Sequence, residues 1–77
     1  MNTKIKTKTQ LTNRLDKAGM PYFVFKISAA EYTYVYCKNK NNTPCLYKFD
    51  KDMKILDATM NLPRIKSTYK AFRKEVK

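Results

Sequence analysis

The fold is decided by residues 22–49, which read YFVFKISAAEYTYVYCKNKNNTPCLYKF. Aromatic and β-branched residues dominate three runs in this stretch, and such residues are typical of β-strands. The runs are residues 22–28, 31–38 and 45–50. Residues 29–30 connect the first two runs as a turn or a bulge, and the polar residues 39–44 form a loop before the third. The sequence therefore predicts three consecutive antiparallel strands, with residues 53–56 as a short fourth strand.

Helical periodicity flanks these strands on both sides. Before them, apolar residues recur at helical spacing over residues 9–18, and Gly19 follows the last of them as a stop signal. After them, apolar residues recur every three or four positions over residues 62–76, and Asn61 is a good N-cap. The apolar positions are Leu11, Leu15 and Ala18 in the first helix and Leu62, Ile65, Tyr69, Phe72 and Val76 in the second.

Together these elements predict a small single α+β domain over residues 9–77. The order is α-β-β-β-(β)-α, with an antiparallel meander sheet and two helices packed on one face of it. Residues 1–8 alternate Lys with Ile and Thr, so we expect a mobile basic arm there, with a short edge strand as the alternative. The element order resembles that of double-stranded-RNA-binding domains. Residues 57–61 (DATMN) stand where those domains carry a Gly- and Lys-rich stretch, so the resemblance assigns no residue a role.

The loop at residues 39–44 allows a hairpin in which Cys37 faces Cys45. Because side chains alternate along a strand, this register places one face of the two strands in the core. We assign the odd-numbered residues of the first strand to the same face, under the two helices. The predicted core consists of Phe23, Phe25, Ile27, Thr33, Val35, Cys37, Cys45, Tyr47 and Phe49 from the strands and Leu11, Leu15, Ile65, Tyr69 and Phe72 from the helices.

The opposite face of the predicted sheet carries tyrosine interleaved with lysine. Its members are Tyr22, Val24, Lys26, Tyr32, Tyr34, Tyr36, Leu46 and Lys48. Such surfaces bind single-stranded nucleic acid, because bases stack on the rings while cations follow the phosphates. The alternative is that one helix covers this face and that the tyrosines are there because strands favour them.

The charge of the chain points to an anionic partner. Lys and Arg total 17 against 6 Asp and Glu, which leaves a net charge of +11 on 77 residues. The last helix concentrates this charge, and Lys outnumbers Arg, which favours contacts with phosphates over readout of bases. The candidate nucleic-acid-binding residues are Lys4, Lys6, Lys8, Lys26, Tyr32, Tyr34, Tyr36, Lys48, Arg64, Lys66, Lys70, Arg73, Lys74 and Lys77.

The residue inventory argues against catalysis. The chain has no His for imidazole chemistry or for completing a zinc site with its two Cys, and a single Gly leaves no phosphate-binding loop. We interpret Asp50 and Asp52 as turn residues rather than cation ligands. We therefore expect no enzyme, cofactor or metal. We expect Cys37 and Cys45 to be small buried thiols rather than a disulfide.

No stretch of the sequence is long and apolar enough for a membrane span, and no apolar segment follows the basic N-terminus as a secretory signal requires. We therefore expect a cytoplasmic protein. Attachment to a membrane surface is the weaker hypothesis, because the apolar seam of the last helix is needed for the core.

These patterns predict a small basic nucleic-acid-binding accessory protein, with RNA favoured over DNA. A composition rich in Lys, Asn and Tyr is typical of accessory proteins encoded by phages and mobile elements. The alternative is an inhibitor or antitoxin-like protein that neutralises a host enzyme or a ribonucleoprotein by direct protein binding. Exposed tyrosines and the narrow seam of the last helix would also suit a protein interface.

Overall fold

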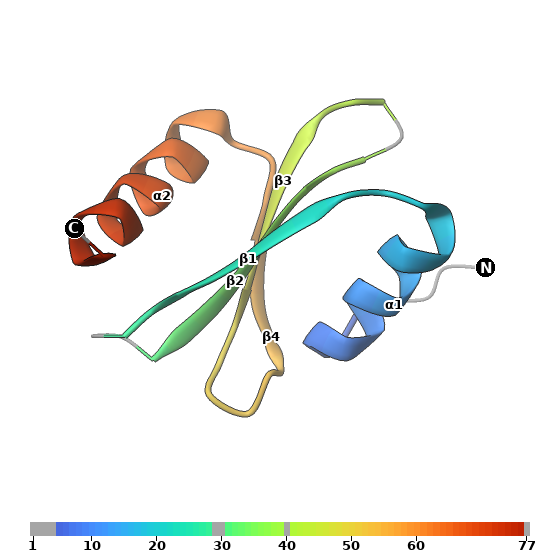
Figure 1. The fold of residues 1–77 in the computed structure, drawn as a ribbon, viewed down its shortest axis with the longest axis horizontal. Helices are drawn as coiled ribbons and strands as arrows, with labels where there is room; N and C mark the ends of the chain where they lie inside the picture. Colours follow the sequence, from blue (N-terminus) through green and yellow to red (C-terminus); the bar gives the residue numbers. More distant parts are fainter. Residues whose placement is uncertain (1–4, 29–30, 40, 77) are drawn as a thin grey trace.

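The computed structural model describes residues 5–28, 31–39 and 41–76 of the chain. Its elements are α1 (Lys8–Ala18), β1 (Tyr22–Ile27), β2 (Tyr32–Lys38), β3 (Pro44–Phe49), β4 (Ile55–Thr59) and α2 (Leu62–Val76). The strands form one antiparallel sheet in the order β1-β2-β3-β4, so each strand pairs with its neighbour in sequence (Figure 1). The predicted α+β class and meander are confirmed. The fourth strand lies slightly further along the chain than residues 53–56.

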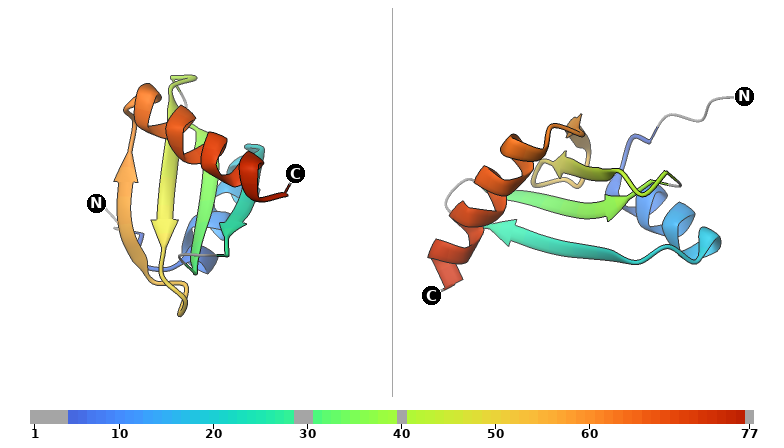
Figure 2. Two further views of the ribbon diagram at one scale, coloured as in Figure 1. Left: turned by 90° about the vertical axis from the view of Figure 1, so that its left-hand side faces the viewer. Right: turned by 90° about the horizontal axis from the view of Figure 1, so that it is seen from above.

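The two helices lie on opposite faces of the sheet (Figures 1 and 2). The first helix packs on the face that carries Val35 and Phe49, whereas α2 packs on the face that carries Tyr34 and Leu46. The prediction that both helices pack on one face is therefore wrong. The single sheet separates two thin cores.

The register of β1 explains this arrangement. The expected pairing of β2 with β3 is confirmed, with Cys37 opposite Cys45. In the other hairpin, Phe25 pairs with Tyr34, which puts Phe25 and its odd-numbered neighbours on the tyrosine face rather than on the Val35 face. A shift of one residue would turn every side chain of β1 to the other face, and both faces of this strand carry apolar residues, so the alternation alone does not select one.

The core under α1 contains Leu11 and Leu15 from the helix, with Val35 and Phe49 beneath them. A capping box at Thr7 starts this helix: the Thr7 hydroxyl accepts a hydrogen bond from the backbone N–H of Gln10, whose side chain accepts one from the N–H of Thr7. Gly19 ends the helix with φ at 68°, a left-handed conformation that glycine adopts without a steric penalty. Both helix boundaries follow from local sequence signals.

The core under α2 is largely aromatic. The rings of Phe25 and Tyr34 stack with their centroids 5.2 Å apart, and the Phe72 ring lies 4.8 Å from that of Phe25. Ile65 is buried against them beside Leu46. The helix runs obliquely across the strands, from the side of β4 to that of β1 (Figure 2). Because of this crossing, α2 covers only part of the tyrosine face.

The segment before α1 is tied to the edge of the sheet. The carbonyl of Lys6 accepts a hydrogen bond of 2.8 Å from the N–H of Ile55, and the N–H of Lys8 donates one of 2.9 Å to the carbonyl of Met53. Thr7 forms an isolated antiparallel bridge with Lys54. The expectation of a mobile arm over residues 1–8 therefore does not hold for Lys6 to Lys8, because these backbone groups are fixed by β4 and its turn. Residues 1–4 lie outside the described residues.

The turn between β3 and β4 is organised by one carboxylate. Asp50 Oδ1 accepts hydrogen bonds from the N–H groups of Asp52, at 2.8 Å, and Lys54, at 3.0 Å. This is the local role that gives Asp its preference for turns. The interpretation of Asp50 as a turn residue is confirmed.

Candidate functional site

The outward side of α2 is a strip of exposed cations. Asn61 starts this helix by accepting a hydrogen bond of 3.0 Å from the N–H of Arg64. Side chains four residues apart then lie one above the other, about 6 Å apart along the axis. The exposed cations of this strip are Lys66, Lys70, Arg73 and Lys74, which surround a shallow hollow together with Tyr69. We call these four residues the basic strip.

Arg64, predicted as a member of the same set, is engaged elsewhere. Its guanidinium forms an ion pair of 3.0 Å with Asp57 of β4. Hydrogen bonds from the backbone N–H of Ala58 and from Arg64 lower the pKa of the Asp57 carboxyl. Both side chains are exposed, so this pair adds little to stability, but it neutralises one of the candidate cations.

The predicted open platform of tyrosines is wrong at its centre, because α2 packs over Tyr34. Tyr34 is only 8% exposed, and burial raises the pKa of its hydroxyl. Tyr32 and Tyr36 are half-buried and pack against the same core. The alternative, in which one helix covers this face, is confirmed.

The remaining predicted residues are scattered. Lys48 is half-buried, with its Nζ 4.1 Å from the centroid of the Tyr32 ring. Lys26 is exposed on β1 but pairs with Thr33, which places it on the α1 face. Lys6 and Lys8 lie beside β4 at the start of α1, and Lys4 and Lys77 lie outside the described residues. Of the described candidate cations, the structure therefore gathers only the four members of the basic strip into one exposed patch.

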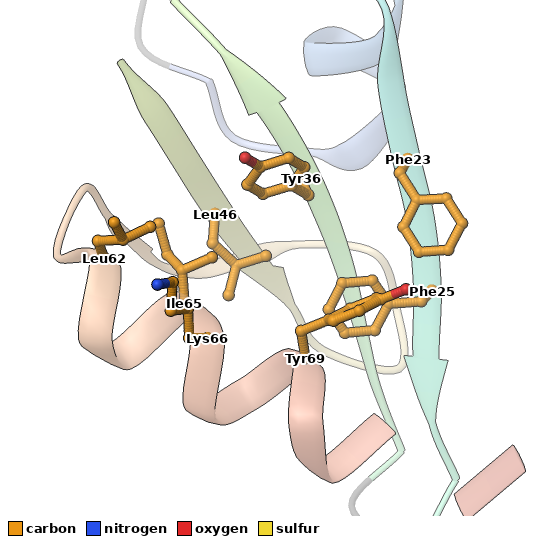
Figure 3. A pocket seen from close by; sticks show the side chains of 8 residues that line it. All are labelled: Phe23, Phe25, Tyr36, Leu46, Leu62, Ile65, Lys66 and Tyr69. Atoms are coloured by element: carbon orange, nitrogen blue, oxygen red, sulfur yellow. The ribbon is translucent and has the colours of Figure 1, made fainter. Parts of the chain in front are cut away.

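An apolar groove of about 430 Å³ runs between α2 and the sheet (Figure 3). Figure 3 shows Leu62 and Phe23 on opposite sides of the groove, with Tyr36 between them. Leu62 and Phe23 stay 42% and 45% exposed, although Phe23 was predicted in the core and Leu62 belongs to the apolar seam of the helix. The lining residues are Phe23, Phe25, Tyr36, Leu46, Leu62, Ile65, Lys66 and Tyr69.

The groove is the feature that sequence reasoning missed. Leu62 and Tyr69 continue the apolar seam of α2, and nothing in their spacing distinguishes them from the buried Ile65. Their exposure follows from the oblique crossing of α2 over the sheet. The crossing angle depends on how the side chains of the helix and the sheet interlock, so the spacing of residues in the sequence does not predict it.

The groove adjoins the basic strip. Lys66 and Tyr69 line both of them. The guanidinium of Arg73 lies 5.9 Å from the centre of the Tyr69 ring, a cation–π contact that places charge beside the aromatic surface. An apolar aromatic site and a cationic site therefore meet along one side of α2.

The two thiols face each other away from this groove. Cys37 and Cys45 are both free and buried under α1, which confirms the interpretation of two small buried residues. Burial, with a smaller contribution from Cys45, raises the pKa of the Cys37 thiol to about 11. A thiol held protonated at neutral pH is a poor nucleophile, so this pair serves packing.

No family model, curated protein or solved structure matches the chain. Within the described ranges, no three or more side chains of His, Cys, Asp or Glu gather as a metal ion would require. Neither helix described here is long and apolar enough to cross a membrane.

Proposed function

We propose that this protein is a small nucleic-acid-binding accessory protein that binds RNA in preference to DNA. One observation carries the proposal: four exposed cations, the basic strip, lie on one side of α2 in a chain of net charge +11. Residues 62–74 of that helix contain no acidic residue, and Glu75 is the one acid within Leu62–Val76. Its origin in a phage or mobile element stays a prediction from composition.

The side chains of the basic strip favour contacts with the phosphate backbone of a nucleic acid over contacts with its bases. Lys presents a compact point charge that attracts a phosphate without reading a base, whereas Arg is the usual bidentate partner of guanine. Three of the four members are Lys, and Arg73 is placed beside the Tyr69 ring. We therefore expect binding to depend mainly on charge and on the shape of the backbone.

The test is the salt dependence of RNA binding, measured by fluorescence anisotropy with a labelled 12-nucleotide RNA. Each phosphate contact with a single strand adds about 0.7 to the slope of log affinity against log salt. Lys70→Glu should lower affinity and reduce that slope. Lys51→Glu is the matched control, because it makes the same charge change at an exposed position in the turn between β3 and β4.

Two outcomes would contradict the proposal. If no RNA or DNA binds at low salt, the protein is not a nucleic-acid-binding protein. If Lys51→Glu weakens binding as much as Lys70→Glu, the attraction comes from net charge and the basic strip is not the interface.

The alternative function is an inhibitor or antitoxin-like protein that docks on a host enzyme or a ribonucleoprotein. The exposed apolar residues Phe23, Met60 and Leu62 favour it, because protein interfaces bury such groups at their centre. Purification from the native host, with and without nuclease, separates the two functions. A protein retained in fixed ratio after nuclease treatment would support the inhibitor.

A further inference from the structure

The groove beside α2 has the properties of a binding site. Its volume of about 430 Å³ lies within the range of pockets that hold small ligands. Phe23 and Tyr69 line it and are 45% and 38% exposed, and their rings meet edge to face with centroids 6.1 Å apart and planes at 74°. Lys66 is the one charged residue in its lining. The site is thus apolar and aromatic, with a single cation at its rim.

The position of that cation restricts the chemistry of the occupant. Lys66 belongs both to the groove and to the basic strip, and Lys70 follows one helical turn further along the strip. A ligand that fills both places must carry a flat apolar group next to an anionic group, followed by another anion. A single strand of nucleic acid has this arrangement, because unpaired bases leave the phosphate backbone at regular intervals.

We infer that the groove receives one unpaired base of a single-stranded RNA. The base stacks on the face of the Phe23 ring and contacts the ring of Tyr69 with its edge, because the planes of the two rings lie at 74° to each other. The adjoining phosphates contact Lys66 and Lys70. This inference rests on the proposed function and adds to it a preference for single strands, because bases inside a duplex are stacked on each other and cannot enter a groove without unpairing. The binding rings are those left exposed by the oblique crossing of α2, not the row of tyrosines on β2.

The test compares two substitutions at one ring. Phe23→Tyr keeps a flat aromatic face, whereas Phe23→Leu keeps most of the apolar volume and loses that face. Val24→Ala is the matched control, since Val24 is a neighbouring exposed residue on the opposite face of β1. Each variant is titrated by anisotropy with a labelled 12-nucleotide oligoadenylate and with an RNA duplex of the same length. Thermal unfolding confirms that each variant is folded.

We expect the wild type to bind the oligoadenylate more tightly than the duplex. Phe23→Leu should weaken binding of the single strand by about 5- to 150-fold, as the loss of one stacked base does. Phe23→Tyr and Val24→Ala should retain the wild-type affinity. All variants should bind the duplex alike, because the basic strip is intact. A photoreactive 5-iodouridine strand should crosslink to Phe23 or Tyr69.

Failure of this inference is distinguishable from failure of the proposed function. If the wild type binds RNA but Phe23→Leu binds the single strand equally well, the groove does not stack a base while the basic strip still binds phosphates. That result would also be expected of a groove that takes an apolar anchor of a partner protein, since leucine preserves the apolar volume. If the wild type binds no nucleic acid at low salt, both proposals are wrong.

Discussion

Tyr34 lies at the centre of the core under α2, stacked on Phe25 and 8% exposed. Tyr34→Ala removes a buried ring and should lower the free energy of unfolding by about 3–5 kcal/mol, much of the total for a domain this small. Tyr34→Phe removes only the hydroxyl and should change it by less than about 1 kcal/mol. Urea unfolding followed by circular dichroism measures both. If the alanine variant were as stable as the wild type, the Tyr34 ring would not be buried in the core under α2.

Cys37 gives the stability a dependence on alkaline pH. Its pKa rises from an ordinary value of 9.0 to about 11 in the folded state, because burial disfavours the thiolate. The contribution of the protonated thiol is therefore fully present below pH 9 and is lost as the pH rises towards 11. We expect the melting temperature to fall over this range. The fall should be smaller in Cys37→Ala, and an identical pH profile in that variant would contradict the assignment.

Few residues of α2 are buried against the sheet, so the contribution of each to the free energy of unfolding can be measured separately. Ile65 is 4% exposed, whereas Leu62, one turn earlier, is 42% exposed at the groove. Ile65→Ala should cost about 2–5 kcal/mol of unfolding free energy, and Leu62→Ala should cost clearly less because its side chain is half in water. Chemical denaturation measures both values. If the two substitutions lowered the free energy of unfolding equally, Leu62 would be as buried as Ile65 in solution and the groove would be closed.

The start of α1 tests whether the N-terminal segment belongs to the fold. Thr7 caps the helix and pairs with Lys54, so Thr7→Ala should lower stability by about 1 kcal/mol. Thr9→Ala, two positions inside the helix, is the control and should be neutral or slightly stabilising because Ala is the best helix former. If both variants melt at the wild-type temperature, the segment before the helix is not anchored by its cap.

Much of this fold was readable in short stretches of sequence. Gly19 and Asn61 mark helix boundaries through local hydrogen bonding, and the loop at 39–44 fixes the pairing of Cys37 with Cys45. The side of the sheet on which α2 packs could not be predicted, because both faces of β1 carry apolar residues and the alternation does not select its register with β2. Of the candidate site, the sequence indicated the basic strip and could not indicate the groove, which tertiary packing creates.

At the scale of the whole molecule, α2 is the only cover of the aromatic face in the described structure. A chain that ends at residue 61 keeps α1 and all four strands but exposes Phe25, Tyr34 and Leu46 as one apolar surface. We expect this truncated chain to self-associate, seen as early elution in size-exclusion chromatography and as enhanced fluorescence of the dye ANS. A monomeric truncated chain that binds no dye would mean that α2 does not protect this face.

The place of that cover after all four strands has a consequence for the order of folding. The α1 layer has all of its parts within residues 5–59, whereas the aromatic face is completed only by residues 62–76. A folding intermediate can therefore contain the sheet and α1 without α2. Such an intermediate presents Phe25, Tyr34 and Leu46 as a surface that chaperones bind.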